Sequence, residues 1–308
     1  MRAIMYHYIR EFDPSLPNFK FLDINDFKKQ LDWFENTFGF VSRDEFEQSM
    51  LKKTPFNNPG QIILTFDDGF LDHYQYVYPE LIKRGLWGIF YLSTGPYASN
   101  KILDVHRIQL LCGQVRGTDL LKETLSLVSE DMIEAWKVQE FKNSRYTNQI
   151  NVAGVKDVKL ILNYYIKPEP KEIIIDQLCS IFNIAYPADN YYLNINQIKH
   201  MAQNNMIFGS HTVNHNVMST LTLTQQTAEI QDSFLFLEQN LSQAYKTYCH
   251  PYGGSASYNQ NTIDILTKNN VHFSFSVESR QITPSDLRNS SQSLPRFDCN
   301  EFPHGLAK

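Results

Sequence analysis

Short apolar runs alternate along the chain with longer segments in which apolar residues recur every three to four positions. A run rich in β-branched and aromatic residues is typical of a buried strand, and the longer spacing is typical of an amphipathic helix. The expected strands are Ala3–Ile9, Phe40–Val41, Ile62–Phe66, Trp87–Leu92, Met206–Ser210, Tyr245–Cys249 and His272–Val277. Strands that alternate with helices predict an α/β fold with parallel strands and outer helices.

Helices are expected between these strands. The first has N-cap residues at Asn25 and Asp26 and ends at Gly39, and the helix after Ile62–Phe66 ends at Gly85. The later ones are expected over Ile195–Asn204, Thr224–Leu241 and Thr262–Lys268. The pattern alone fits both a sheet closed into a barrel and an open doubly wound sheet. Neither GxGxxG nor GxxxxGK[ST] occurs, so no motif supports a nucleotide-binding fold.

Residues from about 104 to 190 follow a different pattern. Helical spacing dominates this stretch, and Lys167–Pro170 (K-P-E-P) is expected to break the chain before a helix over Lys171–Phe182. We therefore predict a single domain over residues 1–308 with a mostly helical insertion. The insertion is either a substrate-facing lid or a helical excursion that only packs on the rest of the fold.

Composition and charge narrow the class of protein. With 42% hydrophobic and 20% charged residues, the 308-residue chain resembles an ordinary soluble globular protein. The formal net charge of -5 and the lack of a basic tract argue against a nucleic-acid partner. The N-terminal residues lack a signal-peptide apolar region, and no apolar run approaches 18 residues. The expectation is a cytoplasmic protein without a transmembrane segment, and its four scattered cysteines suit a reducing compartment.

Two adjacent carboxylates follow an expected strand that is an almost unbroken apolar run. Asp67 and Asp68 directly follow Ile62–Phe66. Two like charges this close need compensation to stay ionised, and a metal ion would provide it. The C-terminal end of a barrel strand is also where catalytic groups gather. The alternative is an Asp-rich turn in which Gly69 supplies a positive φ.

A histidine pair follows another expected strand. His211 and His215 come directly after Met206–Ser210, and on a helical turn side chains four apart lie over each other. Two imidazoles and one carboxylate form a three-ligand catalytic zinc set with an open position for water. Because parallel strands end at one face of the fold, the acid pair and the histidine pair are expected to meet there. The second acid would then remain available for proton transfer.

Three motifs in this order and spacing resemble those of a known family. They are T-F-D-D-G (Thr65–Gly69), G-S-H-T-V-N-H (Gly209–His215) and H-P-Y-G (His250–Gly253). They resemble the first three motifs of the polysaccharide deacetylase family, carbohydrate esterase family four, of NodB-homology type. The resemblance covers residues 1–103 and 191–308. It implies a distorted (β/α)7 barrel and metal-dependent removal of an N-acetyl, or N-formyl, group from an amino sugar.

The resemblance also implies roles for individual residues. Asp68, His211 and His215 would bind a divalent metal, commonly zinc, and Asp67 would be the general base. In this mechanism a metal-bound water attacks the amide carbonyl. The backbone N–H of Tyr252 would stabilise the resulting oxyanion.

The general acid departs from the common family pattern. No Leu-x-x-His motif is found near the C-terminus of this sequence. The segment M-Y-H-Y-I instead resembles a Tyr-His segment on the first strand of a poly-N-acetylglucosamine deacetylase subgroup. His7 is therefore the first candidate for the acid that protonates the leaving amine, and His304 is the alternative.

The third motif also departs from the family pattern. Tyr248-Cys249-His250 stands where members usually carry an arginine. Arg296 could supply the missing guanidinium and hold Asp67 through a bidentate pair. The alternative is a surface arginine that pairs with Asp298.

The resemblance implies that the substrate is an N-acetylated sugar used in making a surface glycan. An expected cytoplasmic location favours a nucleotide-linked or lipid-linked precursor over an oligomer outside the cell. Two other functions remain open at this point. One is an amidohydrolase that acts on a small non-sugar amide or cyclic imide, and the other is an inactive glycan-binding module, which would bind no metal.

Overall fold

The computed structural model describes residues 1–141, 152–185 and 188–308, which form two compact units. The first unit consists of Met1–Glu11, Phe21–Lys101 and Ala188–Lys308. The second unit consists of Phe12–Lys20 and Ile102–Pro187. Each unit has its own apolar core.

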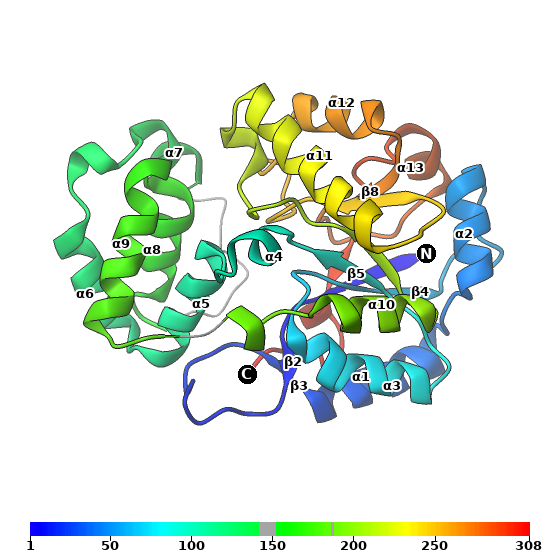
Figure 1. The fold of residues 1–308 in the computed structure, drawn as a ribbon. Coiled ribbons are helices and arrows are strands. Elements are labelled where there is room, and N and C mark those ends of the chain that lie inside the picture. The colour runs from blue at the N-terminus through cyan, green and yellow to red at the C-terminus, as the bar shows by residue number, and fades with distance from the viewer. Residues whose placement is uncertain (142–151, 186–187) are drawn as a thin grey trace. The chain divides into compact units, whose positions relative to one another are not determined.

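A seven-stranded parallel sheet forms the centre of the first unit (Figure 1). Its strands, in spatial order, are β8 (Val271–Phe275), β7 (Lys246–Cys249), β6 (Ile207–Ser210), β5 (Ile89–Leu92), β4 (Ile62–Phe66), β1 (Arg2–Tyr6) and β9 (Phe297–Asp298). The sheet curls into an incomplete barrel with helices outside it. This architecture confirms the prediction of a distorted (β/α)7 barrel.

Most residues of β1 and of β4 to β8 are buried, as continuous apolar runs predict for a parallel sheet. All five residues of β4 are buried, and the rings of Phe66 and Phe90 stack across the β4–β5 pair with centroids 4.7 Å apart. The register aligns Tyr6 with Phe66 and Phe66 with Phe90. Neighbouring strands therefore end at a common edge, where the chain leaves the barrel core.

The helices of the first unit lie between these strands in sequence. They are α1 (Ile24–Thr37), α2 (Arg43–Lys52), the π-helix η1 (His73–Val77), α3 (Tyr78–Lys83), α4 (Gly95–Ser99), α10 (Ile195–Gln203), α11 (Leu223–Asn240), α12 (Gln260–Lys268) and α13 (Pro284–Asn289). Three short 3₁₀ helices, η4 (Ala188–Asn190), η5 (Met218–Thr220) and η6 (Cys299–Glu301), and a small parallel pair, β2 (Ile9–Arg10) with β3 (Leu22–Asp23), complete it. Within the described ranges, no helix has the length and apolarity needed to cross a bilayer.

The second unit is mostly helical, as expected for residues 104–190. Its elements are α5 (Asp104–Gln114), α6 (Gly117–Leu127), η2 (Glu130–Met132), α7 (Ala135–Phe141), α8 (Val155–Leu160), the π-helix η3 (Ile161–Tyr165) and α9 (Pro168–Ile181). Its core includes Ile108, Leu120, Val158 and Leu178. The helical chain does break before α9, at Ile166 and Lys167, but the helix begins at Pro168 instead of the predicted Lys171. A proline fits the first helical turn, where its missing N–H has no intrahelical partner.

Several other predicted boundaries are also wrong. The first strand ends at Tyr6 rather than Ile9, so His7 lies just beyond it. The N-cap of α1 is Asp23, whose carboxylate accepts a hydrogen bond from the backbone N–H of Asn25 at 2.8 Å. Phe40 forms only an isolated bridge with Ile62 instead of a strand.

Candidate active site

The two aspartates lie on a turn with unusual backbone angles at the end of β4. Asp68 has φ of 76° and Gly69 has φ of 68°. A Cβ on Gly69 would lie 2.6 Å from the side chain of Leu92, so the turn requires glycine there. Two other non-glycine residues of the site, His215 (φ 54°) and Tyr252 (φ 61°), also adopt the left-handed backbone conformation. Such angles cost about 1–3 kcal/mol each and concentrate at functional sites.

Asp68, His211 and His215 converge on one point. Asp68 Oδ1 lies 3.7 Å from His211 Nε2 and 3.5 Å from His215 Nε2. All three side chains are buried, and their ligand atoms lie within 4.8 Å of one another. Ligands bonded to tetrahedral zinc at about 2.0–2.1 Å are roughly 3.3–3.5 Å apart. The spacing and the donor types therefore fit a single divalent ion.

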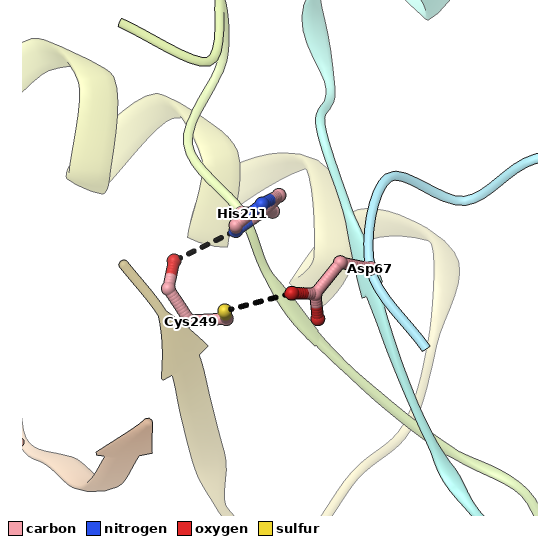
Figure 2. A group of neighbouring side chains, drawn as sticks. All are labelled: Asp67, His211 and Cys249. Carbon is pink, nitrogen blue, oxygen red and sulfur yellow. Dashed lines mark hydrogen bonds between the residues drawn. The ribbon is translucent and has the colours of Figure 1, made fainter. Parts of the chain in front are cut away.

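His211 is oriented by a backbone carbonyl. Its Nδ1 lies 2.8 Å from the carbonyl oxygen of Cys249 (Figure 2). Because a carbonyl only accepts, Nδ1 carries the proton and the Nε2 lone pair faces Asp68. Burial lowers the pKa of His211 despite the nearby carboxylates, which keeps the ring neutral. A neutral imidazole with its free nitrogen toward the carboxylate is ready to bind a metal.

The histidine pair does not lie on a helical turn, so that part of the prediction is wrong. His211–Asn216 form an irregular loop, in which the backbone N–H of His215 donates to the hydroxyl of Thr212 at 3.0 Å. The buried carboxylate of Glu229, on α11, holds this loop and replaces the hydrogen bonds that a helix would make. Its donors are the backbone N–H groups of Val213 and Asn214 and the side-chain amides of Asn214 and Asn216, at 2.7–3.1 Å.

Asp67 forms a bidentate pair with Arg296. Arg296 Nη1 donates to Asp67 Oδ1 and Nη2 donates to Oδ2, both at 2.8 Å. Both side chains are almost fully buried, at 2% and 1% exposure. Burial alone would raise the pKa of Asp67, but the charge and hydrogen bonds of Arg296 outweigh it and lower the pKa to about 2. Asp298 instead accepts a hydrogen bond from the backbone N–H of Asn300.

His7 and His304 occupy different environments. His7 Nε2 lies 4.0 Å from Asp67 Oδ2, and 41% of the His7 side chain is exposed. His73 Nε2–H donates to the backbone carbonyl of His7 at 2.9 Å, which fixes the segment after β1. His304 is exposed on the turn after η6. In the part of the chain that the structure describes, no hydrogen bond or ion pair joins His304 to Asp67 or to the metal-ligand set.

Tyr252 follows β7 and packs against His215. Its ring centroid is 4.8 Å from that of His215, in an edge-to-face arrangement. Gly253 also has positive φ, and a Cβ there would lie 2.2 Å from the side chain of Val277. His250 is buried, and its Nε2–H donates to the carbonyl of Gln292 at 2.8 Å. The H-P-Y-G motif is thus a tightly packed turn that brings Tyr252 to the metal-ligand set.

Three residues beside the site were not predicted to contribute to it. Glu229 holds the histidine loop, His73 supports the backbone at His7, and Cys249 contacts both Asp67 and His211. Glu229 had a signal in the sequence, because it is an acid next to Ile230 in the apolar stripe of the helix over residues 224–241. A buried acid on such a stripe needs partners. The roles of His73 and Cys249 depend on contacts that only the fold creates.

Comparison with known proteins gives the family context. Residues 179–275 match the family model described as polysaccharide deacetylase. No match was found among curated protein sequences. The matched range contains the second and third sequence motifs, with His211, His215 and Tyr252.

Solved structures share the fold over almost the whole chain. The deacetylase PplD of Streptococcus pyogenes, in complex with acetate, has a TM-score of 0.58 and 19% identity, over 97% of this chain and 91% of that one. A de-N-acetylase from Aggregatibacter actinomycetemcomitans has a TM-score of 0.53 and 13% identity, over 96% and 93%. The BpsB deacetylase domain from Bordetella bronchiseptica has a TM-score of 0.52 and 13% identity, over 96% of this chain and 94% of that one. Together with the family match, this shared fold confirms the resemblance to the polysaccharide deacetylase family that the sequence motifs indicate.

Proposed function

We propose that the protein is a metal-dependent hydrolase that removes the N-acetyl group from an amino sugar. The observation that carries this proposal is the convergence of Asp68, His211 and His215 beside the Asp67–Arg296 pair. Hydrolysis of an amide by water needs a group that polarises the carbonyl and a base that accepts the proton of the water. A metal site next to an ionised carboxylate can provide both. The family match and the deacetylases that share the fold support the same reaction class.

Asp68, His211 and His215 would hold the metal. Two neutral imidazole nitrogens and one carboxylate oxygen suit zinc and leave a coordination position open. A divalent ion bound there would polarise the amide carbonyl and make a water molecule more acidic. The carbonyl of Cys249 and the carboxylate of Glu229 fix the ligands before any ion binds.

Asp67 and His7 would move the protons. Asp67 accepts a proton from the attacking water as the new C–O bond forms, because its paired carboxylate is ionised at neutral pH. The C–N bond then breaks, and the protonated imidazole of His7 donates a proton to the amine nitrogen. The products are acetate and a free amino sugar. The distance of 4.0 Å between His7 Nε2 and Asp67 Oδ2 places the acid and the base beside the same reaction centre.

The backbone N–H of Tyr252 would contribute to oxyanion stabilisation. The left-handed φ of Tyr252 and the tight turn at Gly253 set the direction of this peptide group beside His215. A donor fixed before the reaction stabilises developing negative charge without reorganisation.

The proposed substrate is an acetamido sugar of a surface glycan, in nucleotide-linked, lipid-linked or oligomeric form. The test is to load the protein with zinc and to measure acetate and formate release from a panel of these three forms and from cyclic imides. We expect acetate from at least one acetamido sugar, and a loss of about 100-fold or more in Asp67→Asn with zinc retained. Hydrolysis of cyclic imides alone would indicate a small-amide hydrolase. Glycan binding without zinc or turnover would indicate a binding module.

A further inference from the structure

We infer that Cys249 is a positioning residue that couples the Asp67–Arg296 pair to the metal ligand His211. This inference rests on the proposed function, because it assigns a second layer of support to the same site. It predicts that the Cys249 side chain determines turnover without itself binding the metal or the substrate.

Cys249 touches both halves of the site. It is the last residue of β7 and is fully buried. Its Sγ lies 2.9 Å from Arg296 Nη2. Sγ also lies 3.5 Å from Asp67 Oδ2, and the carbonyl of Cys249 accepts the Nδ1–H of His211 (Figure 2). A single residue thus connects the carboxylate–guanidinium pair to the orientation of a metal ligand.

The strand holds Cys249 in place. It pairs with Phe275 of β8, and the backbone N–H of the next residue, His250, donates to the Phe275 carbonyl at 3.0 Å. On the other side, Tyr248 pairs with Ser210 of β6, directly before His211. The thiol and the carbonyl of Cys249 are therefore fixed by the sheet rather than by a loop.

The thiol completes the hydrogen bonding of a buried arginine. A guanidinium has five N–H donors. In Arg296, Nε donates to the carbonyl of Ser276, Nη1 donates to Thr65 Oγ1 and Asp67 Oδ1, and Nη2 donates to Asp67 Oδ2. The remaining acceptor is Cys249 Sγ, whose own S–H points to Asp67 Oδ2. Arg296 is fully buried, so water does not replace this acceptor.

Removing the sulfur would therefore affect one half of the site more than the other. Without Sγ, one buried N–H of Arg296 loses its acceptor and Asp67 loses a donor, which frees the pair to rotate. The carbonyl that orients His211 belongs to the backbone and remains in any variant. Turnover should fall, while zinc binding should persist.

The first test compares Cys249→Ala, Cys249→Ser and the control Cys299→Ala. Cys299 is also buried in the first unit, where its Sγ contacts the carbonyl of Gly305 instead of the site. We expect Cys249→Ala to lower kcat about 10-fold, with KM and zinc content unchanged. Cys249→Ser, whose hydroxyl both accepts and donates, should recover most of kcat, and Cys299→Ala should match wild type.

Three results would overturn the inference. Wild-type kcat in Cys249→Ala would show that the thiol does not position the pair. Equal losses in Cys249→Ala and Cys249→Ser would indicate a packing effect. Loss of zinc in Cys249→Ala would indicate metal ligation by the thiolate, since Asp67, His211 and Cys249 also lie close enough to share an ion.

A second test does not depend on activity. Urea unfolding midpoints of Cys249→Ala, Arg296→Met and the double variant, measured in EDTA, form a double-mutant cycle. We expect the cost of Cys249→Ala to disappear when Arg296 is already replaced. Additive costs would overturn the inference, whatever the enzyme's substrate. If wild type releases no acetate from the sugar panel, the proposed function fails. The double-mutant cycle would still show whether the side chains of Cys249 and Arg296 interact.

Discussion

The buried Asp67–Arg296 pair sets the energetics of the site at the scale of single residues. Each charge pays a large desolvation penalty on burial, and the bidentate geometry offsets it. Every further contact of the guanidinium is to a neutral acceptor, so the charge balance depends on these two side chains. Removing one partner leaves the other charge buried without compensation.

Arg296→Met should therefore destabilise the protein by about 3–5 kcal/mol. Methionine is long and apolar and fills much of the space of the arginine side chain. The loss of stability should therefore come mainly from leaving the charge of Asp67 buried without a partner. Urea unfolding in EDTA measures it, and the double variant with Asp67→Asn is the matched control. The double variant should regain part of the loss. If it is less stable than Arg296→Met alone, the pair does not carry the stability assigned to it.

The choice between His7 and His304 is also a question for single residues. His7 faces Asp67 across 4.0 Å, and His304 is exposed on a terminal turn. His7→Ala should lower kcat by about 100-fold or more, because the leaving amine then lacks its proton donor. His304→Ala should stay within about twofold of wild type, well below the 10² expected for an acid. Wild-type rates in both variants would exclude both residues from this role, equal losses would leave the acid unidentified, and a loss confined to His304→Ala would reverse the assignment.

At the scale of elements, the loop over residues 211–216 depends on α11. Thr212 and His215 both adopt positive φ, which is unfavourable for residues with side chains. The Glu229 carboxylate compensates by accepting hydrogen bonds from two backbone and two side-chain donors of the loop. The helix thus holds, through one carboxylate, the loop that carries the two proposed metal ligands His211 and His215.

Glu229→Gln should weaken zinc affinity by about 10–100-fold. In this variant an NH₂ group replaces one of the two carboxylate oxygens. An NH₂ group cannot accept a hydrogen bond, so the N–H donors of the loop that face it lose their acceptor. Competition with a chromophoric chelator measures the affinity, and Asp232→Asn, an exposed acid on the same helix, is the control. Unchanged affinity in Glu229→Gln would show that the loop keeps its shape without this carboxylate.

The start of α13 gives a pH prediction. Burial raises the pKa of Asp286, but hydrogen bonds from Arg280 and Thr283 outweigh it and lower the pKa from 3.8 to about 2. Because the folded pKa lies below the unfolded one, folding favours the charged form. The stabilisation is complete above pH 3.8 and is lost as the pH falls through 2.

The free energy of unfolding of wild type should thus fall more steeply than that of Asp286→Asn between these pH values. Urea unfolding across this range measures the two slopes. Parallel slopes would contradict the assignment of a low pKa to Asp286.

At the scale of the whole molecule, the pattern of the sequence was sufficient to predict parallel strands with outer helices and the meeting of the polar strand ends, whereas the barrel was expected only through the family resemblance. Ile62–Phe66 and Met206–Ser210 are mostly apolar, and such runs end at a shared edge of a parallel sheet. The contact between Arg296 and Asp67, 229 positions apart, was expected only through the family resemblance. Local spacing could not reveal it.

Other features depend on tertiary contacts and could not be predicted. The histidine loop follows the hydrogen bonds of Glu229 rather than the helical turn suggested by a spacing of four. The position of Cys249 between Asp67 and His211 requires β4, β6 and β7 to be in register. Helix ends were the least predictable, as the start of α9 at Pro168 shows, because capping depends on single residues.

The central claim is that Asp68, His211 and His215 hold one divalent ion. The direct measurement is the zinc content of purified wild type, Asp68→Ala and His215→Ala after equilibration with zinc and removal of excess metal. We predict one zinc per wild-type chain and none in either variant, with each variant folded by circular dichroism. Unchanged zinc content in the variants would contradict the ligand assignment and the hydrolase mechanism built on it.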